Sequence, residues 1–465
     1  MQALMANLFG LGGGAQSSDD VSMQSTSRDT DDDTMSTDSS EDWHEPILND
    51  FNRIENDPQP QARSGHRMWA TGSSIYIVGG YNPHPAHQLL NDLPDDEIDP
   101  ILREVWRLNC ITDTWDRIPL SGNVPNEFAS FALCATMDES HLLMVGGTGV
   151  PFGDTATNAV QCLSMVEPDR GTWSILYCDG DKPTPTYGQS VCRMPGAFNE
   201  FLVVGGTSGF VYNMHVHKLT LEKNKTNGRY VGHWQRLDIS DDSLAQNPSD
   251  VPSPRYRHEI VCDGERVWVF GGGTRDEVFG FDTLACFDLK VKKWIPAIAT
   301  EPDPEEGYPT ARKCHALVRD QSNPSLVYIL GGFYTGGPLP EDDEDEADED
   351  EFHSEVLSDC WQFNLETRRW CRLPVYMDQQ VFFHAAAINQ DGCIYTHGGV
   401  TNVENTERTA GCYRLWTKPP TLKWLAAHKL VTVVPDLARD TRRMQQIGLP
   451  TCLTHWIGGN KVVAA

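Results

Sequence analysis

Four arginines stand just before short apolar runs of the sequence and could together bind a carboxylate. They are Arg63, Arg255, Arg257 and Arg312. Guanidinium groups bind a carboxylate through paired, charge-assisted hydrogen bonds, which suits the charged end of a peptide. Tyr187 and Phe383 stand at comparable places and would add an aromatic wall. The alternative is that each arginine makes a structural contact inside the fold, and the sequence leaves both interpretations open for any one of them.

Histidines recur at related places in the chain, at His66, His258, His315 and His384. We expect His258 and His384 to form part of the same pocket wall. Four histidines could suggest a metal site, but no cysteine or carboxylate completes a tetrahedral set of ligands. We therefore expect no bound metal and no cofactor.

The thirteen cysteines form no Cys-x-x-Cys pair, and most of them fall inside apolar runs. This pattern is typical of buried free thiols in a reducing compartment, and none of them is placed like a catalytic nucleophile. The first fourteen residues lack the basic flank of a signal peptide, and no run of about 18 apolar residues occurs. We expect a cytoplasmic or nuclear protein that does not enter membranes.

Acidic residues outnumber lysine and arginine by 66 to 37 over 465 residues, which gives a net charge of −29. Residues 1–60 hold thirteen acids and two bases, and the run 341–351 holds ten acids and no base. A chain this acidic is a poor general binder of nucleic acid or of anionic membranes. We expect residues 1–39 to be a disordered acidic tail and residues 341–351 an acidic loop insertion.

An apolar run that ends in two glycines occurs six times. The doublets end at Gly80, Gly147, Gly206, Gly272, Gly332 and Gly399, and their spacings are 67, 59, 66, 60 and 67 residues. A further strand-like run follows each doublet, and five of the six units then carry a tryptophan. These are Trp115, Trp173, Trp234, Trp294 and Trp370. Each unit therefore predicts four short strands with a glycine doublet after the second one.

A single four-stranded sheet cannot bury both of its faces, whereas a closed ring of six sheets can. Glycine after the second strand lets the chain turn sharply and approach a neighbouring backbone. In such a ring the segments before each first strand and the loops after each doublet share one face. The four arginines should therefore converge at the central mouth of that face.

The sixth unit lacks a fourth strand, because Pro419-Pro420 stands where that strand would run. The segment Trp43–Leu48 reads like the strand around Trp115. We predict that Trp43–Leu48 closes the ring as the outer strand of the sixth sheet, which would remove an open sheet edge.

Beyond Pro420 the residue types and their spacing become typical of α-helices. Thr421 is a plausible N-cap, and Leu422, Leu425, Ala426 and Leu430 fall on one face of the predicted helix. Leu449-Pro450 introduces a further helix that contains Leu453. We expect a small helical domain over residues 418–458, followed by a tail of residues 459–465.

The repeated unit resembles the kelch repeat, and six copies imply an all-β, six-bladed kelch propeller over residues 40–417. Kelch repeats usually have a period of about 50 residues, so the excess length here would lie in inserted loops. Over residues 63–457 the chain also resembles one particular family of kelch proteins, and this second likeness is carried by GGTGVPFG (146–153), RYRHEI (255–260), FHAAA (383–387), HGGV (397–400) and LAAHKL (425–430).

The helix after Thr421 is similar to the elongin C-binding box of cullin 2 substrate receptors, which reads Ser/Thr-Leu, a small Cys or Ala, then an aliphatic residue. Ala426 fills the small position, and Leu449-Pro450 with Leu453 looks like the cullin 2 box that follows. The resemblance implies a non-catalytic substrate receptor of a cullin 2 RING ubiquitin ligase. Its partners would be elongin B–elongin C, cullin 2 and a RING subunit.

Relatives of this kind bind the extreme C-terminus of proteins, often tails that end in Gly or Ala, and direct them to the proteasome. The basic mouth agrees with this, because it could capture a terminal carboxylate. The chain itself ends in Ala464-Ala465, so we expect weak self-association through this tail.

Two other functions remain open at this point. A kelch scaffold that regulates stress-kinase and phosphatase signalling would bind partners without residues 421–457. A copper enzyme of the galactose oxidase kind would need His and Tyr ligands at the mouth, and the sequence offers a poor set.

Overall fold

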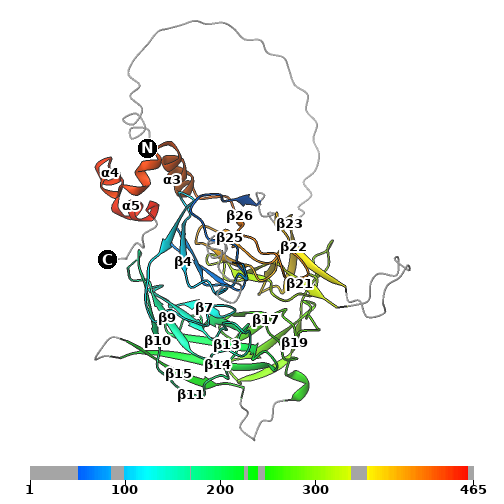
Figure 1. Ribbon diagram of the computed structural model, residues 1–465. Coiled ribbons are helices and arrows are strands. Elements are labelled where there is room, and N and C mark those ends of the chain that lie inside the picture. The colour runs from blue at the N-terminus through cyan, green and yellow to red at the C-terminus, as the bar shows by residue number, and fades with distance from the viewer. Residues whose placement is uncertain are drawn as a thin grey trace, which may run out of the picture. The chain divides into compact units, whose positions relative to one another are not determined.

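The computed structural model describes residues 51–84, 99–167, 169–224, 229–238, 247–336 and 353–458. The strands of this part form six mainly antiparallel sheets, and α-helices follow them at the C-terminal end (Figure 1). The sheets are the six blades of a β-propeller, so the predicted fold class is confirmed. The first strand of each blade lies innermost, and the fourth lies at the outside.

Blades one to three follow one another along the chain. Blade one consists of β2 (Arg67–Thr71), β3 (Ser74–Val78), β4 (Val105–Asn109) and β5 (Thr114–Ile118). Blade two consists of β7 (Ala132–Ala135), β8 (His141–Val145), β9 (Val160–Ser164) and β10 (Gly171–Ile175), and β6 (Leu120–Gly122) runs parallel to β10. Blade three consists of β12 (Ser190–Arg193), β13 (Glu200–Thr207), β14 (Tyr212–Lys223) and β15 (Tyr230–Arg236), with β11 (Cys178–Gly180) parallel to β15.

Blades four to six complete the ring. A 3-10 turn, η2 (Pro248–Asp250), precedes blade four, which consists of β16 (Glu259–Cys262), β17 (Arg266–Phe270), β18 (Thr283–Asp288) and β19 (Lys293–Ala299). Blade five consists of β20 (Ala316–Arg319), β21 (Leu326–Thr335), β22 (Ser354–Asn364) and β23 (Arg369–Tyr376). Blade six consists of β24 (Ala385–Ile388), β25 (Cys393–His397), β26 (Cys412–Trp416) and β1 (Asn52–Arg53).

The glycine doublets join each blade to the next. The N–H of the second glycine of every doublet donates to a carbonyl of the following blade, over 2.8–3.1 Å. At the first glycine the backbones are so close that a Cβ on Gly79 would lie 2.6 Å from the carbonyl oxygen of Phe128. Gly79 also has a φ of 63°, which a side chain would disfavour. This close approach is why the doublet recurs in all six units.

The five predicted tryptophans lie on the fourth strands of blades one to five, and all of them are buried. Trp173 on β10 meets Phe128 of the loop before β7 edge-to-face, with ring centroids 5.3 Å apart. Trp370 on β23 donates its indole N–H to the carbonyl oxygen of Phe281 in blade four, over 3.1 Å. These side chains fill the space between sheets, as large aromatic plates are expected to do.

The segment that closes the ring lies later in the chain than we predicted. The strand beside β26 is β1, in which Asn52 pairs with Arg414 and Arg53 pairs with Tyr413. Trp43–Leu48 lies outside the described residues, and its proposed position is occupied by β1. The likeness of Trp43 to Trp115 misled the prediction, because blade six closes instead with the buried side chains Phe51 and Ile54 on either side of β1. The acidic segments 1–39 and 341–351 and the tail 459–465 also lie outside the described residues.

Removing residues 1–57 is expected to destabilise the whole propeller. Phe51 packs in a cluster of blades five and six, and Ile54 packs in one that joins blades one and six to the helices. Burial of one such side chain is worth roughly 1.5–3 kcal/mol, so the loss should amount to about 3–6 kcal/mol. Thermal unfolding of the two truncated chains would test this. A chain that begins at residue 38 serves as the control and should unfold like the full chain; equal midpoints for both truncations would contradict the role of β1.

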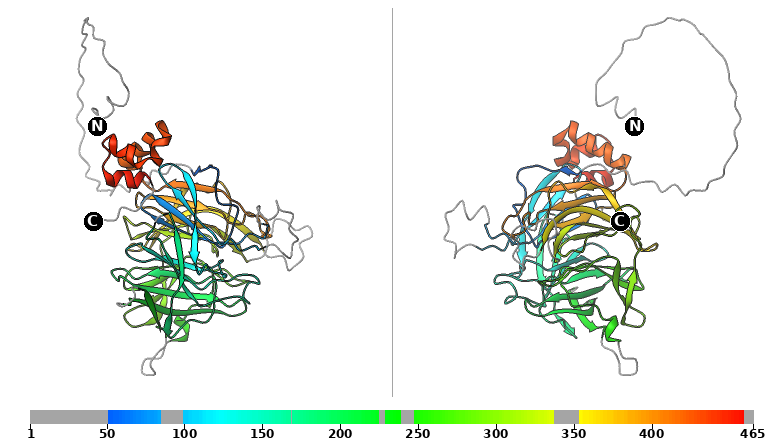
Figure 2. Two further views of the ribbon diagram at one scale, coloured as in Figure 1. Left: turned by 60° about the vertical axis from the view of Figure 1, so that its left-hand side comes forward. Right: turned by 90° about the vertical axis from the view of Figure 1, so that its right-hand side faces the viewer.

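The C-terminal segment forms α3 (Leu422–Val433), η3 (Pro435–Arg439), α4 (Thr441–Gln446) and α5 (Thr451–Ile457). Thr421 caps α3 by accepting a hydrogen bond from the N–H of Trp424. Of the helices that the structure describes, none is long and apolar enough to cross a membrane. Figure 2 shows the helices, in orange and red, beside the blades at the two ends of the propeller sequence.

Candidate functional site

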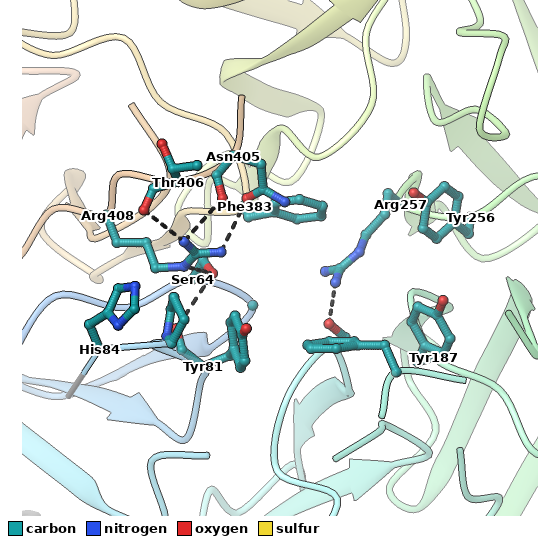
Figure 3. A pocket seen from close by; sticks show the side chains of 14 residues that line it. Ser64, Tyr81, His84, Tyr187, Tyr256, Arg257, Phe383, Asn405, Thr406 and Arg408 are labelled. Carbon is teal, nitrogen blue, oxygen red and sulfur yellow. Dashed lines mark hydrogen bonds between the residues drawn. The ribbon is translucent and has the colours of Figure 1, made fainter. Parts of the chain in front are cut away.

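A cavity of about 500 Å³ opens at the centre of the propeller, where loops from blades one, two, three, four and six meet. Figure 3 shows its main side chains. The cavity is lined by Ser64, Gly65, Tyr81, Pro83, His84, Ser130, Phe152, Tyr187, Tyr256, Arg257, Phe383, Asn405, Thr406 and Arg408. Its size falls within the usual range of small-ligand pockets.

A closed ring of backbone hydrogen bonds surrounds the base of this cavity. One residue just before the first strand of each blade takes part, and we call these six the mouth ring. They are Gly65, Ser130, Gly188, Arg257, Cys314 and Phe383. Each N–H donates to the carbonyl oxygen of the equivalent residue in the preceding blade, over 2.7–3.1 Å, and blade one bonds back to blade six. The ring fixes the six positions relative to one another.

All six residues of the mouth ring have a left-handed backbone, with φ between 55° and 66°. This conformation costs a non-glycine residue of the order of 1 kcal/mol or more, and such residues gather at functional sites. Two glycines meet the requirement without strain. Ser130, Arg257 and Phe383 adopt it with side chains that line the cavity, so their identities set its chemistry.

Arg257 has no carboxylate partner among the residues that the structure describes. Its Nη2 donates to the hydroxyl of Ser130, and its guanidinium lies 4.5 Å from the ring centroid of Phe383. The buried Nε has no hydrogen-bond partner in the described chain. Burial lowers the pKa of Arg257 and is the largest influence on it, as expected for a positive charge taken out of water without an anion. The guanidinium nevertheless stays charged, because its pKa begins so high.

Arg408 is a second guanidinium at the cavity, on the opposite side from Arg257 in Figure 3. Its Nε donates to the hydroxyl of Ser64 over 3.1 Å, and its other nitrogens donate to Asn405 and Thr406. The guanidinium also lies 5.1 Å from the ring centroid of Tyr81. All these partners are uncharged, and burial lowers the pKa of Arg408 as well. Sequence reasoning missed Arg408, although it lies in the loop after the sixth glycine doublet, on the face already expected to carry the site.

Four aromatic side chains form a continuous wall on the side of the cavity that blades one to four contribute. Tyr81 meets Phe152 edge-to-face at 5.0 Å, Phe152 meets Tyr187 at 6.3 Å, and Tyr187 meets Tyr256 at 6.3 Å between ring centroids. We call these four residues the aromatic wall. Tyr187 and Phe383, predicted to line a pocket, both do so. A second chain could therefore meet apolar surface beside two unpaired positive charges.

An ion pair lies beneath the mouth ring, across the central channel. Arg67 of blade one and Glu259 of the opposite blade four are 2.6 Å apart, and Ser190 also donates to Glu259 over 3.0 Å. Arg67 is therefore neutralised by its own partner. The pair spans the central channel below the mouth ring, so a ligand in the cavity would contact only the residues of the mouth ring and of the loops around it.

The other three predicted arginines do not line the cavity. Arg63, Arg255 and Arg312 each lie two residues before a member of the mouth ring and are buried. Each donates Nε to the carbonyl two residues earlier and Nη1 to the carbonyl of the first glycine of its own blade. These acceptors are Gln61 and Gly79, Ser253 and Gly271, and Thr310 and Gly331, at 2.9–3.2 Å. These three arginines therefore make structural contacts inside the fold, which is the alternative that the sequence left open.

The charges of these three arginines are already accommodated. Arg63 pairs with Glu104, and Arg312 pairs with Asp359 through two nitrogens. Arg255 instead lies 3.6 Å from the ring centroid of Phe279. Buried arginines with such partners support the fold of the blade and are not available to a ligand.

Comparison with known proteins agrees with this architecture. The family model described as the KLHDC2/KLHL20/DRC7 Kelch-repeats domain matches residues 24–206 and 199–428. Kelch domain-containing protein 10 of Homo sapiens is 35% identical over 406 residues, which cover 87% of this chain and 81% of that protein. The chain belongs to the Kelch domain-containing protein 10 family.

Two further relatives show how far the similarity extends. The Kelch domain-containing protein 10 homolog of Drosophila melanogaster is 31% identical over 413 residues, which cover 85% of this chain and 61% of that protein. Kelch domain-containing protein 2 of Bos taurus is 24% identical over 355 residues, which cover 74% of this chain and 77% of that protein. The kelch repeats expected from the glycine doublets are thereby confirmed.

The predicted pocket residues His258 and His384 lie outside the mouth cavity of this kelch propeller. Each directly follows a member of the mouth ring and is buried between blades. Nε2 of His258 bonds the carbonyl oxygen of Val204 in blade three over 3.1 Å. In blade three the equivalent residue is Gln189, whose side-chain amide donates to Val145 of blade two over 2.7 Å. Burial lowers the pKa of both histidines to about 3, so at neutral pH they carry no charge with which to bind an anion.

Acid is therefore expected to destabilise the kelch propeller through these histidines. Their pKa is lower in the folded chain than the ordinary value near 6.5, so below that pH the unfolded chain binds more protons. Stability should fall as the pH drops from about 6.5 toward 3, by about 1.4 kcal/mol per pH unit for each histidine. Urea unfolding at pH 7 and pH 5 would measure this loss.

The control is the double variant His258→Gln/His384→Gln, in which both positions carry the residue that blade three has at Gln189. It should lose about 4 kcal/mol less than the native chain between pH 7 and pH 5, because two groups that take up protons on unfolding are gone. An unchanged difference between the two pH values would show that these histidines do not govern acid sensitivity.

The helical segment packs at the end of blade one that is opposite to the mouth. Asn109 donates to the carbonyl oxygen of Ile457 over 2.8 Å, and Nδ1 of His428 bonds the carbonyl oxygen of Ile111 over 2.9 Å. Trp424 meets Trp416 of β26 at 4.9 Å between ring centroids. The buried face of α3 is thus held by the propeller, and the mouth stays uncovered by these helices.

The residues of the predicted elongin C and cullin 2 box lie in two settings. Leu422 is 84% exposed, and Leu425, Ala426 and Pro450 are also exposed. The remaining three are half-buried against the cluster that joins the helices to blades one and six. They are Leu430, Leu449 and Leu453. The helix α3 therefore carries an apolar stripe on the side away from the propeller.

Proposed function

We propose that this kelch protein is a substrate-recognition subunit that captures the C-terminal carboxylate of other proteins in its mouth cavity. The observation that carries the proposal is the pair Arg257 and Arg408. Both guanidinium groups reach the cavity, and the hydrogen-bond partners of both in the described part of the chain are uncharged. A terminal carboxylate supplies the missing anion and accepts charge-assisted hydrogen bonds.

The surroundings of the two guanidinium groups support binding of a peptide end. The hydroxyls of Ser64 and Ser130 contact the guanidinium groups and can donate to an incoming oxygen. The aromatic wall offers apolar contact for the last side chains. The preference for tails ending in Gly or Ala follows from the resemblance to C-terminus-binding receptors and forms part of the proposal.

The second half of the proposal is assembly into a cullin 2 RING ubiquitin ligase in the cytoplasm or nucleus. Leu422, Leu425 and Ala426 present an exposed apolar stripe on α3, which elongin C would cover in the complex with elongin B. Leu449, Pro450 and Leu453 would contact cullin 2. Because the helices pack at the end of blade one away from the mouth, a ligase partner and a substrate could bind at once. Proteasomal degradation of the captured protein would follow.

The test of carboxylate capture compares two fluorescent ten-residue peptides with the same sequence ending in Ala-Ala. One peptide has a free C-terminal carboxylate, and the other has a C-terminal amide. Hydrogen bonds to a charged group are worth about 1.5–3 kcal/mol, so amidation should weaken binding by about 10- to 100-fold in an anisotropy titration. Equal affinities for the two peptides would refute capture of the carboxylate.

The chain's own end is a candidate ligand of the same kind. The seven residues of this sequence that follow Gly458 extend at most about 25 Å. Since α5 packs at the end of the propeller opposite to the mouth, we propose that Ala464-Ala465 binds the mouth of a second copy. An added C-terminal aspartate should then reduce self-association in sedimentation experiments, and an unchanged oligomeric state would rule this binding out.

A further inference from the structure

An exposed apolar surface borders the cavity on blades two and three. It consists of Val150 and Phe152 in the loop after β8, with Phe210 and Val211 in the hairpin between β13 and β14. We call these four residues the apolar rim. Phe152 is 42% exposed and also lines the cavity, while Phe210 is 86% exposed and Val211 66%. Large apolar side chains so close to a binding cavity mark a contact surface.

The two loops of the apolar rim are pressed against each other. A Cβ on Gly153 would lie 3.2 Å from the Cα of Gly209 and 3.1 Å from the carbonyl oxygen of Ser208. Both glycines have a positive φ, of 91° and 105°. A side chain on either glycine would push the two backbones apart and would be strained at this φ, so the sequence of both loops favours their close approach.

Hydrogen bonds fix each loop of the apolar rim from within. In the hairpin, the hydroxyl of Thr207 donates to Val211 over 3.1 Å and accepts from the N–H of Gly209 over 3.0 Å. In the other loop, the hydroxyl of Thr155 donates to Pro151 over 3.0 Å and accepts from the N–H of Gly149 over 2.9 Å. The backbone that carries the apolar side chains is therefore already ordered before a ligand binds, which lowers the entropy cost of binding.

The edges of the cavity on blades four and six have a different character. On blade six the exposed loop carries Asn402, Glu404 and Glu407 around a single valine, Val403. On blade four the exposed residues are Arg275, Asp276 and Glu277. A peptide that leaves the cavity over blades two and three meets apolar surface, whereas the edges on blades four and six offer charge.

We propose that the apolar rim is a second subsite, which binds bulky apolar side chains a few residues before a captured C-terminus. This inference rests on the proposed function. Consecutive residues of an extended chain advance by roughly 3.3 Å, so a cavity of about 500 Å³ holds only the last few of them. The residues before these, when they leave the cavity over blades two and three, lie against the rim. The occupant is thus the segment of the substrate tail that precedes its end.

Such a subsite would let the protein distinguish one C-terminal tail from another. Every protein chain ends in a carboxylate, so Arg257 and Arg408 alone cannot distinguish one tail from another. Specificity is a difference between affinities and needs contacts that only some ligands can make. Tails with apolar residues just before the end would bury Phe210 and Val211, and tails of serine and glycine would not.

The test uses two fluorescent peptides with free carboxylates, GSGSLFLSAA and GSGSSSSSAA, and the full chain. The peptides share their last three residues and differ at the fourth, fifth and sixth from the end. Partial burial of these side chains and of the rim should make the first peptide bind about tenfold more tightly. The variant Phe210→Ser should reduce this advantage to within about twofold.

Two further measurements keep the test decisive. Phe210 is exposed, so Phe210→Ser should unfold at the same temperature as the native chain, and Phe152→Ser provides a second variant of the rim. The matched control is Tyr177→Ser, because Tyr177 is 71% exposed but lies between the outer strands β10 and β11. This control should keep the full tenfold advantage.

The outcomes separate the two proposals. If both peptides bind through their carboxylates with equal affinity, or Phe210→Ser keeps the advantage, the apolar rim is not a subsite and the proposed function stands. If neither peptide binds the native chain, capture of these tails fails and the inference fails with it. A tenfold preference that both rim variants remove and the control retains would establish the subsite.

Discussion

Replacing Arg257 with glycine is expected to abolish carboxylate capture while leaving the kelch propeller folded. Arg257 supplies one of the two unpaired positive charges at the cavity, so its loss should weaken binding of an Ala-Ala peptide by about 100-fold. Glycine adopts the left-handed backbone at this position, where φ is 56°, without strain. Gly65 and Gly188 already occupy equivalent places in the mouth ring. The thermal midpoint should therefore change little, and anisotropy titration with thermal unfolding would measure both quantities.

The contrasting variant is Arg63→Met, which removes a buried arginine outside the cavity. It leaves Glu104 with only the exposed Arg117 as a partner and the carbonyl oxygen of Gly79 without a donor, so stability should fall by about 2–4 kcal/mol. Binding per folded molecule should stay within a few-fold of native, because Arg63 does not line the cavity. The assignment of roles would be wrong if Arg63→Met folded normally and lost capture of the carboxylate while Arg257→Gly kept it.

The fold could be predicted from the sequence because its determinants repeat. Gly79 and its five counterparts stand where one blade's backbone approaches the next, and no other residue fits there. The tryptophan of each fourth strand recurs because each pair of sheets leaves a similar gap to fill. The closing strand was predicted at the wrong place, since blade six closes with Phe51 and Ile54 and so lacks the repeated tryptophan signal.

The candidate site could be predicted only in part, because arginines that are close in the sequence lie in different surroundings in the fold. Arg255 and Arg257 are two residues apart, yet the first is buried within blade four and the second belongs to the mouth ring. The difference is set by the left-handed turn at residue 257 and by hydrogen bonds between neighbouring blades, which no pattern of residue types reveals. Arg408 was within reach, because the loop that contains it was already placed on the mouth face.

Substitutions on the exposed face of α3 are expected to abolish binding of the ligase partners, which is the second large effect. In the double variant Leu422→Arg/Ala426→Arg, two charged side chains replace the exposed apolar stripe that elongin C would cover. Burying an unpaired guanidinium in an apolar groove is strongly unfavourable, so affinity should fall by at least about 100-fold and capture should be lost. Both residues are exposed, so the variant should fold and bind peptides as the native chain does. Co-purification with elongin B–elongin C and cullin 2 measures the effect.

The matched control for α3 is Val291→Arg, because Val291 is an exposed valine in the turn between β18 and β19, away from the helices. Capture by the native chain and by Val291→Arg, with loss in the double variant, would show that the stripe on α3 recruits the ligase. If the native chain captures neither elongin B–elongin C nor cullin 2 yet still binds C-terminal peptides, the helices serve only to cover blades one and six. The protein would then be a kelch scaffold that holds its partners by their C-termini, and the role of Arg257 would be unchanged.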